Sequence, residues 1–158
     1  MATEVERQQY RSVIGHFATG VAVITAAGED GPAGMTTNAL CSLSLDPILL
    51  LVCFDNGART LGVVRESGRF GVNVLRAGQD ALAGVFASKA SHREKFEGVG
   101  WSEEAGVPVL DGALAWLACE LRETLPGGDH TIGIGAVDAM HHDSGDPLVW
   151  FRGAYAQP

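Results

Sequence analysis

The sequence has few cysteines and no long hydrophobic run, and both features limit the classes of protein to which it can belong. Only three cysteines occur in 158 residues, at Cys41, Cys53 and Cys119, and no C-x-x-C pair is present. An odd number of widely spaced cysteines predicts buried free thiols in a reducing compartment rather than a disulfide framework. No apolar stretch approaches the roughly 20 residues that span a bilayer, and the charged first residues lack a signal-peptide core. We therefore expect a cytoplasmic protein with no membrane association.

Basic residues are also scarce. The chain carries 11 lysines and arginines against 19 aspartates and glutamates, for a net charge of −8. A surface of that sign repels nucleic acid, and the one basic cluster, residues 89–95, is too short and too mixed to bind a duplex. An anionic ligand would depend on a few local cations, and the available side chains are Arg59, Lys89, Arg93, Lys95 and Arg152.

The common motifs of nucleophilic and metal-dependent catalysis are missing. There is no Gly-x-Ser-x-Gly, and no cysteine–histidine pairing indicates a nucleophile. The His-His-Asp run at 141–143 could ligate a metal, but adjacent histidines point in different directions, so a solvated loop is the better interpretation. The Gly-Ile-Gly run at 133–135 lacks the third glycine and the helix of a dinucleotide fingerprint, so it predicts small residues in a strand. We predict no bound metal.

What the chain does contain is a hydrophobic content of 46%, enough for one domain with a sizeable core, and no linker or repeat divides residues 1–158. A capping box at Thr3 and Glu6, followed by apolar residues at helical spacing, predicts a helix over 4–17. Further helices are expected at 58–67 and 79–88, and strands at 21–26, 33–39, 48–54, 69–75, 114–124, 130–140 and 148–151.

These elements predict a mainly β protein. The strands are not separated by regular helices, which favours antiparallel pairing and a closed or partly closed barrel with a few covering helices. The run 48–54 is apolar at every position, so we expect it to be buried on both faces.

The segment before that strand is the most informative part of the chain. Residues 36–39 read Thr-Thr-Asn-Ala, and Ser42 and Ser44 follow. Such residues offer backbone N–H groups, hydroxyls and an amide to a flat ligand with polar edges, although clusters of this kind are more commonly solvated turns. Asp129 and His130, after two glycines, leave two interpretations open: a ligand contact at the barrel rim, or a histidine bonded only to its own loop.

Short motifs spread over Tyr10 to Tyr155 make the chain resemble the short-chain flavin reductases, the small components of two-component flavin-dependent monooxygenases. The motifs are GHFATGVAVIT at 15–25, MTTNA at 35–39, SLSLDP at 42–47, FGVNV at 70–74, FAS at 86–88, KF at 95–96 and GDHTI at 128–132. The resemblance implies an antiparallel, Greek-key-like split β-barrel, a tight homodimer, and flavin bound at the barrel rim near the dimer interface.

The resemblance also implies which residues contact the cofactors. The isoalloxazine ring would be lined by Thr36, Thr37, Asn38, Ala39 and Ser42, and beneath it would lie Val52, Cys53 and Phe54. The phosphate would be bound by Asn56, Arg59 and Thr60, the cofactor would be flanked by Phe86, Ala87 and Ser88, and anionic groups would be steered by Lys89 and Lys95. The nicotinamide nucleotide would be contacted by His130, Arg152 and Tyr155. Related proteins commonly have a serine where Gly57 or Ala58 stands here, which leaves Arg59, Thr60 and the helix N-terminus for the phosphate.

The implied activity is hydride transfer from NADH or NADPH to FAD or FMN, with the reduced flavin passing to a partner monooxygenase. The flavin supplies the electron sink, so the protein needs no catalytic nucleophile, acid or base of its own. The sequence leaves FAD against FMN open, and the resemblance favours NADH over NADPH. Two alternatives remain: flavin held as a prosthetic group that reduces another acceptor, and a flavin-binding protein without enzymatic activity.

Overall fold

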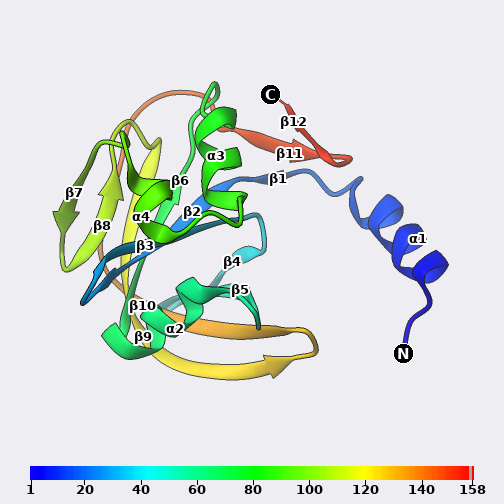
Figure 1. Ribbon diagram of the computed structural model, residues 1–158, viewed down its shortest axis with the longest axis horizontal. Helices are drawn as coiled ribbons and strands as arrows, with labels where there is room; N and C mark the ends of the chain where they lie inside the picture. Colours follow the sequence, from blue (N-terminus) through cyan, green and yellow to red (C-terminus); the bar gives the residue numbers. More distant parts are fainter. Residues whose placement is uncertain (157) are drawn as a thin grey trace.

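The computed structural model describes residues 1–156 and 158. Figure 1 shows a mainly β protein with a few short helices, as the sequence predicts. The helices are α1 (Glu4–Ile14), α2 (Arg59–Ser67), α3 (Asp80–Ala87) and α4 (His92–Phe96). The strands are β1 (Thr19–Gly20), β2 (Ala22–Gly28), β3 (Gly31–Thr37), β4 (Leu40–Leu45), β5 (Ile48–Asp55), β6 (Arg69–Val74), β7 (Trp101–Glu104), β8 (Val107–Leu110), β9 (Ala115–Gly127), β10 (His130–His142), β11 (Val149–Phe151) and β12 (Ala154–Ala156).

The main sheet contains seven strands in the order β3-β2-β6-β9-β10-β5-β4. Every neighbouring pair is antiparallel. The two edge strands, β3 and β4, do not pair with each other within the described residues, so the ladder of hydrogen bonds is open. β1, β11 and β12 form a separate small sheet, and β7 pairs only with β8.

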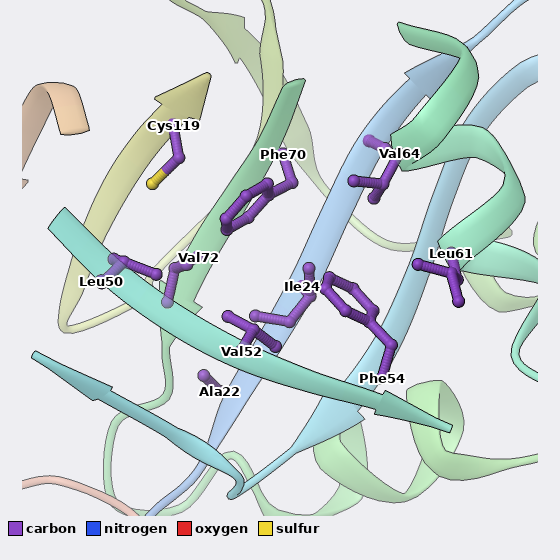
Figure 2. Packing of buried hydrophobic residues seen from close by; sticks show 11 residues of the cluster. Ala22, Ile24, Leu50, Val52, Phe54, Leu61, Val64, Phe70, Val72 and Cys119 are labelled. Carbon is purple, nitrogen blue, oxygen red and sulfur yellow. The ribbon is translucent and has the colours of Figure 1, made fainter. Parts of the chain in front are cut away.

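The main sheet curls around one hydrophobic core. β2 and β5 are not neighbours in the sheet, yet Ile24 of β2 packs in the same cluster as Val52 and Phe54 of β5. Figure 2 shows these side chains meeting between the strands, with Leu61 and Val64 of α2 closing one side. The sheet must curve for the inward faces of such distant strands to meet in one core.

Small residues in β10 make room for two aromatic rings. A Cβ atom at Gly133 would lie 2.8 Å from the Phe54 ring, and one at Gly135 would lie 2.5 Å from the Phe70 ring. Phe54 and Phe70 meet edge to face, with ring centroids 6.2 Å apart. The sequence prediction of a small-residue strand over 133–135 is therefore confirmed, and the glycines exist for close packing.

The burial of β5 differs from the sequence prediction. Leu50, Val52 and Phe54 are buried, whereas Leu49 and Leu51 on the opposite face are half-buried. The prediction of burial on both faces is wrong because no element of the same subunit covers the outer face completely. Facing residues of β10 continue this surface, since Ile132 pairs with Cys53 and Ile134 pairs with Leu51. We call the resulting set the outer apolar stripe: Leu49, Leu51, Cys53, Ile132, Ile134 and Ala136.

The first helix has almost no contact with its own subunit. The capping box of Thr3 and Glu6 is present, but the helix ends at Ile14, before the predicted residue 17. It buries no residue, and the side chains of Tyr10 and Val13 are 67% and 68% exposed. Figure 1 shows α1 at the edge of the molecule, beyond β1. Its apolar face has no partner within the described part of the chain.

Several short elements were not predicted from the sequence: β1, β4, α4, β7, β8 and β12. The cysteine prediction is partly wrong, because Cys119 is buried but Cys41 is exposed and Cys53 is half-buried. Burial raises the pKa of the Cys119 thiol to about 12. No helix in the described part of the chain is long and apolar enough to cross a membrane.

A buried amide ties the β7–β8 hairpin to the main sheet. Asn73 of β6 is fully buried, and its Oδ1 accepts a hydrogen bond of 2.8 Å from the backbone N–H of Leu110. Its Nδ2 donates to the carbonyl of Val23 and to Oγ1 of Thr25, both at 3.2 Å. Thr25 in turn donates to the carbonyl of Pro108. A buried polar group whose bonds are all internal stabilises the fold only while every partner is present.

We predict that Asn73→Leu, which keeps the volume but removes these bonds, lowers the free energy of unfolding by about 2 kcal/mol or more. The buried N–H of Leu110 would lose its acceptor, which is the main physical reason. Urea unfolding measures the change, with Thr25→Val as a milder companion variant. A loss of stability no larger for Asn73→Leu than for Thr25→Val would contradict the central role of the amide.

Candidate functional site

Two adjoining pockets lie between the edge of the main sheet and the helices that cover it. We call the first the cation pocket; it has a volume of about 540 Å³. The second, the ring pocket, has a volume of about 210 Å³, and the two share Thr36 and Ala87. The cation pocket is lined by Met35, Thr36, Asp55, Gly57, Ala58, Arg59, Thr60, Phe86, Ala87, Ser88, Lys89, His92 and Lys95. The ring pocket is lined by Val21, Thr36, Thr37, Asn38, Ala87, Trp150 and Tyr155.

The shared wall is built by β3 and α3. Oγ1 of Thr36 donates a hydrogen bond of 2.6 Å to the carbonyl of Ala83 in α3. Gly34 allows this close approach, because a Cβ atom there would lie 2.7 Å from the Phe86 ring. The sequence of β3 therefore places Thr36 directly against the end of α3, and both predicted segments meet at one site.

The N-terminus of α2 opens into the cation pocket. Ala58 caps this helix without a side-chain hydrogen bond. The N–H of Leu61 donates to the carbonyl of Ala58, but within the described residues no such bond involves the N–H groups of Arg59 and Thr60, which can therefore face a ligand. The guanidinium of Arg59 donates to the carbonyls of Lys89 and Ala90, which holds the segment after α3 against α2. The predicted phosphate residues Arg59 and Thr60 thus meet the predicted flanking residues 86–89 in one pocket.

The cation pocket carries an excess of positive charge. Within the described residues, none of the ion pairs involves Arg59, Lys89 or Lys95. The carboxylate among the lining residues is Asp55, whose Oδ1 accepts a 2.7 Å hydrogen bond from the backbone N–H of Gly57. In a chain with a net charge of −8, these side chains form a local site for an anion.

His92 is a lining residue that sequence reasoning missed. Its Nδ1 lies 3.5 Å from the backbone N–H of Gly34. Burial, and then the charges of Arg59 and Lys95, lower the pKa of the imidazole. The signal in the sequence was the basic cluster 89–95, which we interpreted only as too short for nucleic acid. The five-residue helix α4 brings His92 and Lys95 into the pocket.

The ring pocket has polar backbone on one side and aromatic side chains on the other. Nδ2 of Asn38 donates to Oγ1 of Thr19, and the N–H of Ala39 donates to Oγ1 of Thr37. Opposite them, the rings of Trp150 and Tyr155 are 4.9 Å apart at 64°. Trp150 lines this pocket because the unpredicted strand β12 pairs with β11.

Several of the predicted site residues do not line the two pockets. Val52 and Phe54 are 0% exposed in the core of this subunit, so any contact of this strand with the ring would come from its backbone, and that contact stays a prediction. Cys53 faces the outer apolar stripe, and Ser42 lies in β4; neither lines the two pockets.

Asn56 has a structural role in this subunit. Its Nδ2 donates to the carbonyl of Gly128, and its Oδ1 accepts a 2.7 Å hydrogen bond from Oγ1 of Thr131. Both ends of the amide are therefore engaged in joining the end of β5 to the β9–β10 turn. In this subunit the Asn56 side chain makes these two structural bonds, and its contact with the phosphate stays a prediction.

The residues implied to meet the nicotinamide do not come together within one subunit. Tyr155 lines the ring pocket, but His130 lines a different pocket beside α1. Nδ1 of His130 lies 2.7 Å from Oδ1 of Asp129, and this bond lowers the pKa of that carboxyl group. Arg152 is exposed, and its backbone N–H donates to the carbonyl of Gly15.

The His-His-Asp run at 141–143 is exposed, as expected, but His141 and His142 form the end of β10 and pair with β9 instead of lying in a loop. Nε2 of His141 lies 3.3 Å from Oδ1 of Asp143, and no third ligand joins them. Across the part of the chain that the structure describes, no group of three or more His, Cys, Asp or Glu side chains could hold a metal ion.

Comparison with known proteins identifies the family of this chain. Residues 14–158 match the family of flavin reductase like domains. An NADH-dependent flavin reductase of Rhodococcus sp. is 39% identical over 155 residues, which cover 96% of this chain and 86% of the relative. The reductase subunit HsaB of a flavin-dependent monooxygenase of Mycobacterium tuberculosis is 36% identical over 159 residues, covering 98% of this chain and 84% of the relative.

The fold is also similar to that of a solved oxidoreductase. The NADH:FAD oxidoreductase SgcE6 of Streptomyces globisporus superposes with a TM-score of 0.90 at 35% identity, and the match covers 99% of this chain and 95% of the other. Sequence and structure therefore agree over nearly the whole length of the chain. The protein belongs to the flavin reductase family.

Proposed function

We propose that this protein is an NADH:flavin oxidoreductase that transfers hydride from NADH to FAD or FMN. The observation that carries the proposal is the pair of adjoining pockets. One end is cationic and the other is flat and partly aromatic, and Thr36 and Ala87 join them. A phosphorylated flavin has this same division into an anionic end and a flat ring.

The cation pocket fits the phosphate end. The backbone N–H groups of Arg59 and Thr60, together with the side chains of Arg59 and Lys89, would hold the phosphate. Because no described carboxylate pairs with these cations, the phosphate would supply the missing negative charge. This would offset the unfavourable field of an acidic protein around an anionic ligand.

The ring pocket fits the isoalloxazine. The backbone of residues 36–38 would face the polar edge of the ring, and Tyr155 would cover it beside Trp150. A bound flavin supplies the hydride acceptor, and the protein orients the two rings and excludes water. The lining contains no Asp, Glu, His or Lys, which agrees with a reaction that needs no acid or base from the protein.

The product would serve a second protein. The reductase subunit HsaB and similar relatives are components of flavin-dependent monooxygenases, which supports a monooxygenase as the acceptor of the reduced flavin. Both pockets are open at the surface of the subunit rather than enclosed in its core. An open site suits a flavin that binds, is reduced and leaves.

We also propose that the curled sheet is the split β-barrel of a single domain spanning residues 1–158. The shared core of β2 and β5 supports this barrel, because a sheet must curl strongly, as in a barrel, to bring two strands that are not neighbours into one core. A reducing cytoplasm is the compartment we expect for three unpaired cysteines.

We further propose that two copies form a homodimer. Two apolar surfaces are left uncovered by the described residues of one subunit: the exposed face of α1 with Tyr10, Val13 and Ile14, and the half-buried outer apolar stripe. Contiguous apolar surfaces of this kind mark interfaces. A second copy offers both surfaces at once, so each helix would pack against the stripe of its partner or against the partner's helix.

The decisive assay is NADH oxidation, followed at 340 nm, with purified protein and added FAD or FMN. We expect turnover that rises and saturates with free flavin, because the pockets are open. Flavin retained through dialysis, with no response to added flavin, would favour a prosthetic role with another acceptor. Absence of turnover with either flavin, repeated with NADPH, would refute the oxidoreductase assignment.

The role of His130 can be tested separately. We predict that His130→Ala raises the KM for NADH by about tenfold, the loss expected from one hydrogen bond to a polar ligand, while the KM for flavin changes less than twofold. Steady-state kinetics with each substrate varied in turn measures both values. Equal changes in the two constants would assign the residue to the structure of the β9–β10 turn.

For the dimer, we predict that Val13→Asp yields monomers, because the carboxylate would be buried in the apolar interface. Size-exclusion chromatography with light scattering measures the mass. Gln8→Asp, which places the same charge on the opposite face of the helix, is the matched control and should remain dimeric. Wild-type protein that is monomeric at micromolar concentration would exclude the proposal outright.

A further inference from the structure

Lys95 is a charged side chain buried in the wall of the cation pocket. Lys95 is only 6% exposed, whereas Lys89, which lines the same pocket, is exposed. Lysine is among the residues least often buried, because removing an ammonium group from water is strongly unfavourable unless a counter-charge is present. The position of Lys95 therefore needs a physical reason.

The partners of Lys95 within the chain are carbonyl groups. Nζ donates to the carbonyl of Phe86 at 3.0 Å and to the carbonyl of Gly34 at 3.4 Å. Two neutral acceptors use two of the three ammonium protons and supply no negative charge. Among the described residues, no carboxylate forms an ion pair with it.

The charged and titratable groups around the pocket make the imbalance larger. Arg59 faces the pocket from α2, His92 from α4 and Lys89 from the segment after α3. Asp55 is the carboxylate at this wall, and its Oδ1 is engaged with the N–H of Gly57. Burial, and then the charge of Arg59, lower the pKa of the Lys95 ammonium. The empty pocket therefore disfavours the protonated form of Lys95.

We propose that Lys95 is the buried counter-charge for the phosphate of the flavin, so that binding of a phosphorylated flavin is linked to protonation of this lysine. This inference rests on the proposed function, since it assigns a ligand to the same pocket. An arriving phosphate dianion compensates the charge that the protein leaves uncompensated. Because the phosphate favours the ammonium form, Lys95 acts in recognition and makes the strength of flavin binding depend on pH.

The direction of that dependence follows from linkage. Lys95 titrates at lower pH in the empty pocket than in the occupied one, because only the occupied pocket contains the phosphate charge. Between these two values, binding takes up a proton, and the affinity for FMN falls as the pH rises. Riboflavin has the same ring and no phosphate, so its affinity should not share this dependence. The ratio of the two dissociation constants isolates the phosphate from any ionisation of the ring.

The test uses full-length protein and two ligands, FMN and riboflavin, with Kd measured by quenching of flavin fluorescence. In wild-type protein at pH 7, FMN should bind at least about tenfold more tightly than riboflavin, the advantage expected from a charged hydrogen bond. Lys95→Met, which keeps the length and removes the charge, should reduce this advantage to less than about threefold. Lys89→Met removes an exposed charge from the same pocket and should have the smaller effect.

Thermal unfolding without flavin separates this role from a purely structural one. If Lys95 is an uncompensated charge, Lys95→Met should raise the Tm of the empty protein by about 3 °C or more, because the desolvated charge is gone. A structural clamp on the two carbonyls would instead give a lower Tm and an unchanged preference for FMN. Those two results together would overturn the inference.

A variant-free measurement covers the case in which Lys95→Met does not fold. In wild-type protein, the preference for FMN over riboflavin should decrease as the pH rises from 7 to 10.5, the ordinary pKa of a lysine, because the pKa of Lys95 lies below that value in the absence of phosphate. A constant preference over that range would overturn the proton linkage. If wild-type protein shows no preference for FMN at any pH, the phosphate assignment of the cation pocket under the proposed function fails as well. A preference that persists in Lys95→Met overturns only the present inference.

Discussion

The close approach of two aromatic rings to the glycines of β10 is the contact on which the rest of the structure depends. Phe54 and Phe70 can lie against this strand because Gly133 and Gly135 have no side chains. The two rings pack β5 and β6 against the same core, and the chain passes from the end of β5 into the start of α2. The free N–H groups of α2 and the guanidinium of Arg59 reach the cation pocket as a consequence of this packing.

Elements with a local physical cause could be predicted from the sequence, and elements without one could not. The capping box of Thr3 and Glu6 and the turn at Gly128 are local signals, and the structure contains both. The strands β4 and β7 carry no clear alternation and exist because a neighbouring strand pairs with them. The burial of β5 could not be predicted either, since an all-apolar run does not reveal that one face is buried and the other only half-buried.

The candidate site shows the same division. Thr36, Arg59 and Ala87 were expected from motifs and do meet, because each lies at the end of an element that the core positions. His92 and Trp150 were not expected, since the first lies in a five-residue helix and the second depends on the pairing of β11 with β12. Val52 and Phe54 were implied to lie beneath the ring, and their side chains are buried in the core.

The first helix, α1, buries none of its residues against its own subunit, and this affects how the protein behaves in solution. An 11-residue helix is shorter than the roughly 12–15 residues at which isolated helices become marginally stable in water, and α1 buries none of its side chains. Within its own subunit, the helix is stabilised by local interactions such as the capping box and the Arg7–Glu4 ion pair. In the proposed dimer, its helical content would increase with protein concentration, whereas the folding of the buried core would not depend on dilution.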